Sequence, residues 1–143
     1  MFNVCNYDFG RFFDKTYGNL TALEAETSFP FGIKRVYYIY EVPDGVRRGF
    51  HSHKDLKQIL ICVHGSVKIL TKTPYEELIT ELSSPDKGLY IGPMVWREMY
   101  DFSPGSVLLV LASEHYNTND YIRNYDEYLS LAENYFKKQG VNI

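Results

Sequence analysis

The feature of this sequence that most constrains its fold is a succession of short segments, rich in β-branched and aromatic residues, between Ile33 and Ala112. Such residues favour strands, and turn sequences such as PDG, SSPDKG and SPG separate the segments. The segments read IKRVYYIY, QILICV, SVKILT, EELITEL, GLYIG, WREMYDF and SVLLVLAS. Many short strands at regular spacing are typical of an antiparallel barrel or sandwich. The sequence therefore predicts an all-β fold.

The last stretch of the chain has a different period. From Ile122 onward, apolar residues recur at helical spacing, with charged residues between them. This pattern predicts an amphipathic helix over about residues 119–139, which begins at a cap formed by Asn119 or Asp120 and ends at Gly140. We expect the helix to cover one face of the barrel and to take no part in catalysis.

The length of the chain and its first residues bear on domain organisation. A chain of 143 residues is long enough for a single domain with its own core and short for two. We expect extra strands within residues 1–32, followed by the barrel at residues 33–116. A strand added at a sheet edge is often exchanged with a second subunit, because an unpaired edge is a template for pairing. The expected assembly is a homodimer, in which the N-terminal strands could be exchanged.

Composition excludes several classes of function. A net charge of -3 argues against nucleic-acid binding, because affinity for the phosphate backbone comes from clustered Lys and Arg. No apolar run reaches the roughly 20 residues that cross a bilayer, and the N-terminal MFNVCNYDFGRFFDK lacks the pattern of a signal peptide. The sequence thus predicts a cytoplasmic protein that binds no membrane. Cys5 and Cys62 lie outside any CxxC motif, which argues against a disulfide framework or a zinc site.

A histidine pair, His51 and His53, lies within RRGFHSHKDLKQILICVHG, residues 47–65. Alternate residues of a strand point to the same face, so both imidazoles are expected to point the same way. A pair so placed could bind one metal ion. Either histidine could also serve as a general base, because a free pKa near 6.5 leaves it mostly neutral at physiological pH. Two solvated or buried histidines without a chemical role are an equally ordinary interpretation of an HxH pair alone.

The residues around the pair are spaced as in the first motif of the cupin family, with Gly45, the two histidines, Gln58 and Gly65 at the fixed positions. The stretch GLYIGPMVWREMYD, residues 88–101, is similar to the second cupin motif. The resemblance implies a cupin-type antiparallel β-barrel of the jelly-roll kind.

In metal-binding cupins an acidic residue and a third histidine complete the ion site, and this chain departs from the family at both positions. Gln58 stands in place of the acid and Arg97 in place of the histidine. A neutral amide is a poor ligand, and a guanidinium cannot lose its proton to become one and repels a cation. We therefore expect no bound metal, and an imidazole that acts as a base while Arg97 keeps it neutral.

Four stretches, FGIKRVYYIY, RGFHSHK, GLYIGPMVWREM and LASEHYNTNDYIRNYDEY, together resemble the cupin-type sugar 3,4-ketoisomerases, and the resemblance runs from about Phe31 to Tyr128. It implies isomerisation of dTDP-4-keto-6-deoxyglucose without a metal or a cofactor. A base takes the proton from carbon 3, an enediol forms, and a proton is returned at carbon 4. The catalytic histidine of the family corresponds to His51, with His53 and Tyr37 beside it to stabilise the intermediate or relay the proton.

The nucleotide part of such a substrate needs cations for its diphosphate and a flat partner for thymine. Arg35, Arg48 and Lys54 lie on or beside the strands expected to line the pocket and are the candidates. Arginine is better suited than lysine to this role, because its guanidinium can donate two parallel hydrogen bonds to phosphate oxygens.

The resemblance also bears on the stereochemistry at carbon 4. Members that form the galacto product carry WHEM where this chain has WREM at residues 96–99, and they tend to have arginine at the position of Tyr17. The configuration depends on which face of the enediol receives its proton, so Tyr17 and Arg97 are assigned to this choice. The expected product is the gluco sugar, dTDP-3-keto-6-deoxyglucose, as in the dTDP-Quip3NAc pathway.

Four other functions stay open at this stage. A galacto-forming 3,4-ketoisomerase differs only in the face of protonation. A dTDP-sugar 3,5-epimerase also abstracts a proton beside a 4-ketone, but it pairs its histidine with an aspartate in a sequence setting that this chain lacks. A cupin that binds sugar nucleotides without catalysis and a metal-dependent dioxygenase complete the set.

Overall fold

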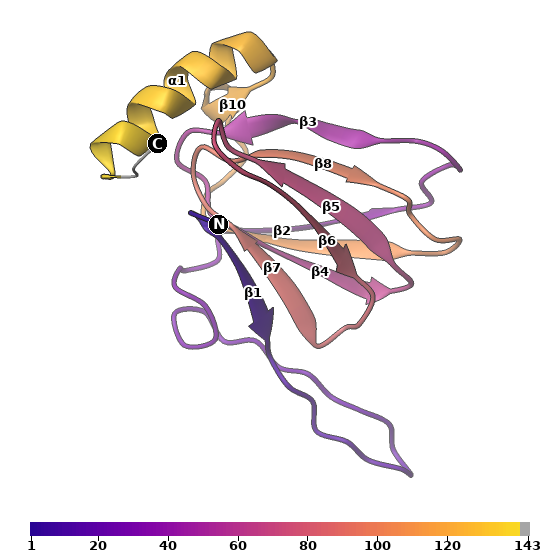
Figure 1. Cartoon of the computed structure of the whole chain (residues 1–143). Helices are drawn as coiled ribbons and strands as arrows, with labels where there is room; N and C mark the ends of the chain where they lie inside the picture. Colours follow the sequence, from indigo (N-terminus) through magenta and orange to yellow (C-terminus); the bar gives the residue numbers. More distant parts are fainter. Residues whose placement is uncertain (141–143) are drawn as a thin grey trace.

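The computed structural model describes residues 1–140, which form two five-stranded antiparallel sheets and a C-terminal helix (Figure 1). The predicted all-β fold with one C-terminal helix is therefore confirmed. The strands are β1 (Val4–Asp8), β2 (Arg35–Tyr40), β3 (Arg48–His53), β4 (Gln58–His64), β5 (Val67–Lys72), β6 (Glu77–Leu82), β7 (Lys87–Ile91), β8 (Trp96–Tyr100), β9 (Val107–Ala112) and β10 (Tyr121–Ile122). The helices are the 3-10 helix η1 (Thr118–Asp120) and α1 (Tyr125–Lys138).

The strand order is β1-β7-β4-β9-β2 in the first sheet and β10-β3-β8-β5-β6 in the second. Most neighbours within a sheet are therefore distant in sequence, as expected for a jelly roll. Each of the seven segments predicted as strands overlaps one observed strand, β2 or one of β4 to β9. Among residues 1–140, no helix is long and apolar enough to span a bilayer.

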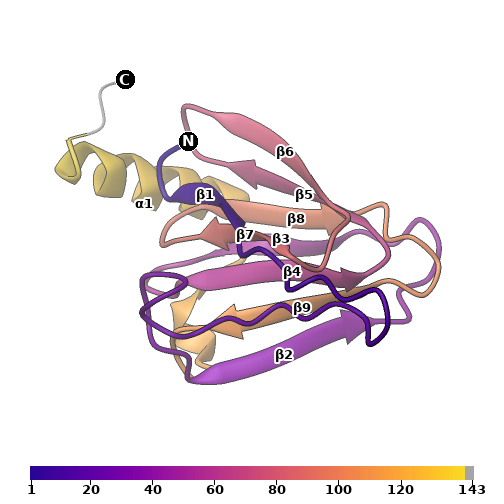
Figure 2. The same ribbon diagram turned by 90° about the horizontal axis from the view of Figure 1, so that it is seen from below.

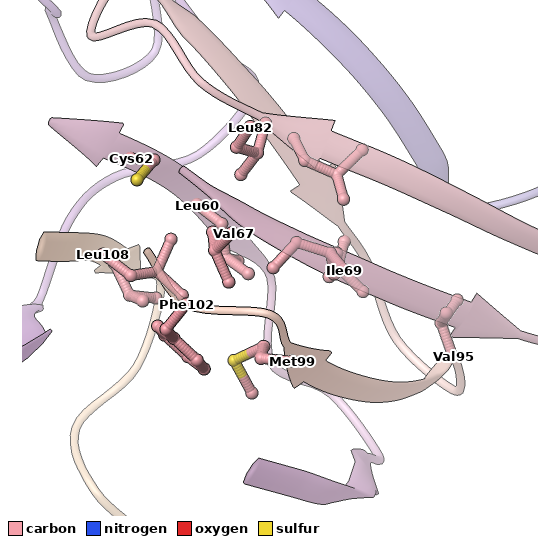
Figure 3. Packing of buried hydrophobic residues seen from close by; sticks show 12 residues of the cluster. Leu60, Cys62, Val67, Ile69, Leu82, Val95, Met99, Phe102 and Leu108 are labelled. Atoms are coloured by element: carbon pink, nitrogen blue, oxygen red, sulfur yellow. The ribbon is translucent and has the colours of Figure 1, made fainter. Parts of the chain in front are cut away.

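The main core lies between the two sheets, where apolar side chains from both inner faces meet (Figure 3). Leu60 and Cys62 of β4 point into this core, whereas Ile59 and Ile61 pack in a second cluster on the opposite face of the same strand. Both faces of β4 are buried, which explains why QILICV is an unbroken apolar run rather than an alternating one. Each aliphatic side chain buried here contributes about 1.5–3 kcal/mol of hydrophobic free energy.

The segment between β1 and β2 covers the outer face of the first sheet (Figure 2). Phe29 and Phe31 are almost fully buried against Ile59 and Ile61. The earlier part of this segment extends away from the sheets as a long arm, which we define as residues 9–23 (Figure 1). A salt bridge from Arg11 to Asp86 holds the base of the arm.

The expectation of several N-terminal strands was largely wrong. Only β1 joins a sheet in this part of the described chain, where it pairs with β7 at the edge. Residues 9–34 form only two isolated bridges, one of which joins Phe12 to Leu20. The physical reason is the backbone geometry: Gly10, Gly18 and Glu26 have φ values of 73°, 89° and 65°, which interrupt the extended conformation of a strand. At the tip of the arm, the Asp14 carboxylate accepts hydrogen bonds from the backbone N–H groups of Thr16 and Tyr17 and forms a turn.

The C-terminal helix packs over one end of the second sheet. Its buried residues Tyr128, Ala132 and Phe136 form a cluster with Met94 and Trp96. The Tyr128 hydroxyl also reaches two backbone carbonyls, those of Lys72 at 3.0 Å and Met94 at 2.9 Å. These contacts fix the helix against strands β5 and β8 and so hold the segment that leads into it.

The helix begins later than the sequence predicted. It starts at Tyr125 rather than near residue 119, and Asn124 caps it by accepting a hydrogen bond from the Glu127 backbone. The predicted caps Asn119 and Asp120 lie instead in η1. The reason is that the next two residues pair with β3 as strand β10, so they cannot be helical. The predicted end is confirmed, since Gly140 follows the last turn with a φ of 76°.

Candidate active site

A cavity of about 350 Å³ lies against the inner faces of β2, β3 and β8 and the segment around β10. Its lining combines aromatic rings, arginines and one histidine. The lining residues are Arg35, Tyr37, Ile39, Arg48, Gly49, His51, Met99, Tyr116, Tyr121 and Arg123. Six of the residues singled out from the sequence as catalytic or substrate-binding therefore meet at or beside this cavity: Arg35, Tyr37, Arg48, His51 and, one layer deeper, His53 and Arg97.

The position of His51 depends on a bulge in strand β3. The pairing of β3 with β8 shifts register between Gly49 and His51, which brings His51 directly opposite Arg97. Gly49 has a φ of 95°, and a Cβ atom there would lie 2.8 Å from the backbone oxygen of Arg97. Glycine is therefore required for this approach of the two strands.

The two histidines lie side by side, as the HxH pattern predicted. Their ring centroids are 4.9 Å apart and the rings are nearly perpendicular. His51 lines the cavity, whereas His53 is 1% exposed and lies behind it. Burial and the charge of Arg97 lower the pKa of His51 to about 4, and the same two causes lower the pKa of His53. Both imidazoles are therefore neutral near pH 7, which is the form that a base needs.

A carboxylate that the sequence did not reveal orients His53. Its Nδ1 lies 2.9 Å from an oxygen of Asp120 in η1. Because a carboxylate only accepts hydrogen bonds, Nδ1 carries the proton, and Nε2 is left as an acceptor. That Nε2 is buried and has no hydrogen-bond partner among residues 1–140. Sequence spacing could not indicate this histidine–aspartate pair, because its two residues lie 67 positions apart.

Arg97 occupies the centre of the site and is 1% exposed. Its guanidinium donates to the Val95 carbonyl, with Nη2 at 3.0 Å, and to the side-chain oxygen of Gln58. Burial lowers the pKa of Arg97 to about 10, so the group is charged near neutral pH. A positive charge therefore lies beside both histidines.

This set of residues does not fit a metal ion. Across the described residues 1–140, no three side chains from His, Cys, Asp and Glu come together as a potential ion site. The two ligand positions that a metal-binding cupin would fill with an acid and a histidine hold Gln58 and the charged Arg97, which contact each other. A cation placed next to His51 and His53 would be repelled by that guanidinium.

Three arginines face the cavity. Arg35 lies 5.0 Å from the ring centre of Tyr37 and 5.5 Å from that of Tyr116, and Arg123 lies 4.4 Å from that of Tyr121. Neither these two nor Arg48 forms an ion pair with any carboxylate of the described chain. Their charges are therefore available to an anionic ligand, and the tyrosine rings offer flat surfaces beside them.

Three residues of this lining were missed by the sequence prediction, namely Tyr116, Tyr121 and Arg123. Tyr116 was assigned to the end of the barrel, and Tyr121 and Arg123 to the predicted helix. The signal that could have found them is the run HYNTNDYIR, residues 115–123, in which two tyrosines and an arginine stand among polar residues in a segment too short to form a core of its own.

Two candidates do not reach the cavity in the chain as described. Lys54 is exposed, and its backbone donates to the carbonyl of Asp120. Tyr17 is 90% exposed on the arm, and it does not line the cavity.

The fold and this cavity define a cupin-type protein with an arginine-rich pocket around a neutral histidine. Residues 3–133 match the FdtA family, described as WxcM-like, C-terminal, and the chain belongs to that family. A TDP-4-oxo-6-deoxy-alpha-D-glucose-3,4-oxoisomerase from Aneurinibacillus thermoaerophilus is 44% identical over 124 residues, which cover 86% of this chain and 89% of that protein.

Two solved structures are similar over almost the whole chain. QdtA, a sugar 3,4-ketoisomerase from Thermoanaerobacterium thermosaccharolyticum solved with TDP, is 57% identical with a TM-score of 0.92, over 95% of this chain and 98% of that one. QdtA has also been solved as an H51N form with TDP-4-keto-6-deoxyglucose. WlaRB from Campylobacter jejuni, a TDP-quinovose 3,4-ketoisomerase, is 45% identical with a TM-score of 0.87, over 91% of this chain and 99% of that one.

Proposed function

We propose that this protein is an isomerase, a 3,4-ketoisomerase that converts dTDP-4-keto-6-deoxyglucose to dTDP-3-keto-6-deoxyglucose. The observation that carries the proposal is a neutral, partly buried His51 in a cavity that also presents three unpaired arginines. Family membership supports the 3,4-isomerase activity, as do relatives of 44% to 57% identity that are named 3,4-oxoisomerase or 3,4-ketoisomerase. The preceding reaction must produce a 4-keto sugar, which is the substrate here. The 3-keto product is the substrate that a transaminase would use next, as in the dTDP-Quip3NAc pathway.

In this mechanism His51 removes the proton from carbon 3 of the sugar. The electrons of the broken C–H bond form the carbon 3 to carbon 4 double bond, and the carbonyl electrons move to the oxygen on carbon 4. That oxygen takes up a proton, which gives the enediol. The hydroxyl on carbon 3 then loses its proton and becomes the new ketone, while the electrons of the carbon 3 to carbon 4 double bond take up a proton at carbon 4. Atoms and electrons balance without an oxidant, so the reaction needs no redox cofactor. Tyr37 and His53 stabilise the enediol or relay its proton.

The reaction as proposed needs no metal ion. A divalent cation would stabilise the negative charge on an enediol oxygen. Here hydrogen-bond donors of the chain stabilise that charge, with the fixed positive charge of Arg97 near them. A preorganised donor of this kind is worth about 10²- to 10³-fold in rate.

The arginines of the cavity are proposed to hold the diphosphate. Arg35 and Arg48 were candidates from the sequence, and Arg123 joins them because it lines the same cavity. Lys54 is exposed and outside the lining, so its assignment rests on the sequence alone. The rings of Tyr116 and Tyr121 are candidates to stack on thymine.

The proposed assembly is a homodimer in which the arm reaches the partner subunit. Phe12, Phe13 and Leu20 of the arm are 76%, 75% and 58% exposed, and such a group of apolar side chains is typical of an interaction surface. Strand β2 lies at the edge of the first sheet, and its outward residues Val36, Tyr38 and Tyr40 are all more than half exposed. An apolar arm and an apolar edge strand complement each other, and an exchanged arm could bring Tyr17 to the partner's cavity.

A charged residue on β2 should break this dimer. The wild-type protein is expected to sediment as a dimer, and Tyr38→Asp as a monomer, because the substitution places a charge within the apolar contact. Ile79→Asp is the matched control, since Ile79 is an equally exposed strand residue on the second sheet. A wild-type monomer in sedimentation velocity, or equal dissociation by the control, would refute the assembly.

The function itself is tested by NMR of the product. Incubation with dTDP-4-keto-6-deoxyglucose in D₂O is expected to yield a 3-keto sugar of gluco configuration with deuterium at carbon 4. Deuterium at carbons 3 and 5 with the ketone still at carbon 4 would indicate a 3,5-epimerase. An unchanged sugar that binds would indicate a non-catalytic protein, and dependence on added iron would indicate a dioxygenase. The galacto configuration at carbon 4 would keep the isomerase and overturn the gluco assignment.

A further inference from the structure

The hydrogen bonds around Arg97 have a direction that the chemistry of the groups determines. An arginine side chain only donates hydrogen bonds, so every oxygen that it contacts must accept. Its Nη1 contacts the side-chain oxygen Oε1 of Gln58. Both groups are buried, with Arg97 at 1% and Gln58 at 2% exposure, so water cannot substitute for either partner.

This contact fixes the orientation of the Gln58 amide. If the amide were flipped, its NH₂ group would face the guanidinium, and two donors would meet in a buried site at a cost of about 1–3 kcal/mol for each unsatisfied group. The oxygen therefore faces Arg97, and the nitrogen Nε2 faces the hydroxyl of Tyr37 at 2.9 Å.

The same logic extends to Tyr37. Its hydroxyl oxygen accepts a hydrogen bond from Gln58, and its single hydrogen is left to donate elsewhere. No acceptor among residues 1–140 takes that hydrogen, while the residue itself lines the cavity next to His51. Burial raises the pKa of the Tyr37 phenol, so the hydrogen is present at neutral pH.

We infer that Gln58 is a positioning residue that makes Tyr37 a hydrogen-bond donor to the reacting sugar. Arg97 orients Gln58, Gln58 occupies a lone pair of the Tyr37 oxygen, and the hydroxyl hydrogen points into the cavity. In the reaction proposed above, on which this inference rests, the donor would meet the oxygen that becomes negative when His51 removes the carbon-bound proton. Gln58 stands at the position of an acidic metal ligand in other cupins. Here it determines that the Tyr37 hydroxyl donates a hydrogen bond to the sugar oxygen, in place of a metal ion.

The test is Gln58→Glu, which keeps the size of the side chain and reverses its polarity toward Tyr37. A glutamate paired with Arg97 can only accept, so the Tyr37 hydroxyl would donate to it and turn its lone pairs toward the sugar. We expect kcat to fall by about 10²-fold, as when one oxyanion donor is lost, with TDP affinity close to that of wild type. Gln139→Glu is the matched control, since it makes the same change at an exposed position, and its kcat should match wild type.

A double-mutant cycle with Tyr37→Phe separates positioning from a general structural effect. If Gln58 acts through the Tyr37 hydroxyl, Gln58→Glu will cost much less once that hydroxyl is absent. All assays include a chelator, because a glutamate beside two histidines restores an acid to the cupin ligand set. An unchanged kcat in Gln58→Glu, or an equal loss in both backgrounds, would overturn the inference. A wild-type protein that forms no 3-keto sugar would instead refute the proposed function.

Discussion

Replacing His51 by asparagine is expected to lower kcat by about 10²- to 10⁴-fold, which is the range that a positioned general base contributes. Asparagine is smaller than histidine and retains a polar group, but it cannot take a proton from carbon. The loss should fall on kcat, because the arginines proposed to hold the nucleotide remain in place. NMR or a coupled assay of 3-keto sugar formation measures the rate, and calorimetry measures the affinity for TDP.

The affinity for TDP is the control for this prediction. The H51N form of QdtA was solved with TDP-4-keto-6-deoxyglucose, so retention of the ligand is also expected here. Loss of TDP binding together with turnover would mean that His51 supports the structure of the cavity. A kcat near that of wild type would remove His51 from the mechanism.

The wild-type pH profile gives an independent measure of the same base. Because kcat/KM falls when the base in the free enzyme is protonated, its acid limb should lie near pH 4 and not near 6.5. The lowered pKa also costs stability in acid, since the unfolded chain takes up protons below about pH 6.5 while the folded chain resists them. Circular dichroism at each pH therefore has to accompany the kinetics.

How much of this site the sequence could predict depends on the range of each contact. That His51 and His53 point to the same face follows from alternation along a strand, a local rule that needs no knowledge of the fold. The roles of His51 and Tyr37 were predicted from the family resemblance, and the bulge that brings His51 opposite Arg97 had no sequence signal. Replacement of the metal ligands by Gln58 and Arg97 was readable from cupin spacing. What the pattern could not reveal is that these two side chains touch each other, because their contact joins β4 of one sheet to β8 of the other.

Asp120 is a residue of the site whose role the sequence pattern predicted wrongly. In the sequence it looks like a helix cap, because Asp commonly precedes an apolar run of helical spacing. The apolar run did extend to Ile122, but that residue packs against the helix from strand β10 and is not part of it. A two-residue strand is too short to have its own pattern, so the pairing that frees Asp120 for His53 could only be found in three dimensions.

The stereochemical assignment yields the second large effect. The double variant Tyr17→Arg with Arg97→His is expected to form mainly the galacto product, because a histidine and an arginine then replace the two groups assigned to the face of protonation. Each tenfold change in the product ratio corresponds to about 1.4 kcal/mol between the two transition states. Proton NMR of the sugar ring distinguishes the products by the coupling at carbon 4. The assay includes a chelator, because Arg97→His adds a third histidine next to His51 and His53 and so restores the three histidine ligands of a cupin metal site. An unchanged gluco product would remove both residues from the assignment.

Mixed dimers can show which subunit supplies Tyr17. Tyr17 is 90% exposed in its own chain and does not line the cavity there, so we expect it to reach the sugar of the partner subunit through an exchanged arm. In a dimer of one His51→Asn chain and one Tyr17→Arg chain, the intact His51 would then be served by the wild-type arm of the partner. Only the cavity of the Tyr17→Arg chain keeps His51, so half of the sites are active. These sites should form the same product ratio as the wild-type protein. If it forms the ratio of the Tyr17→Arg homodimer instead, the arm acts within its own chain, and the exchange of arms at the active site is ruled out.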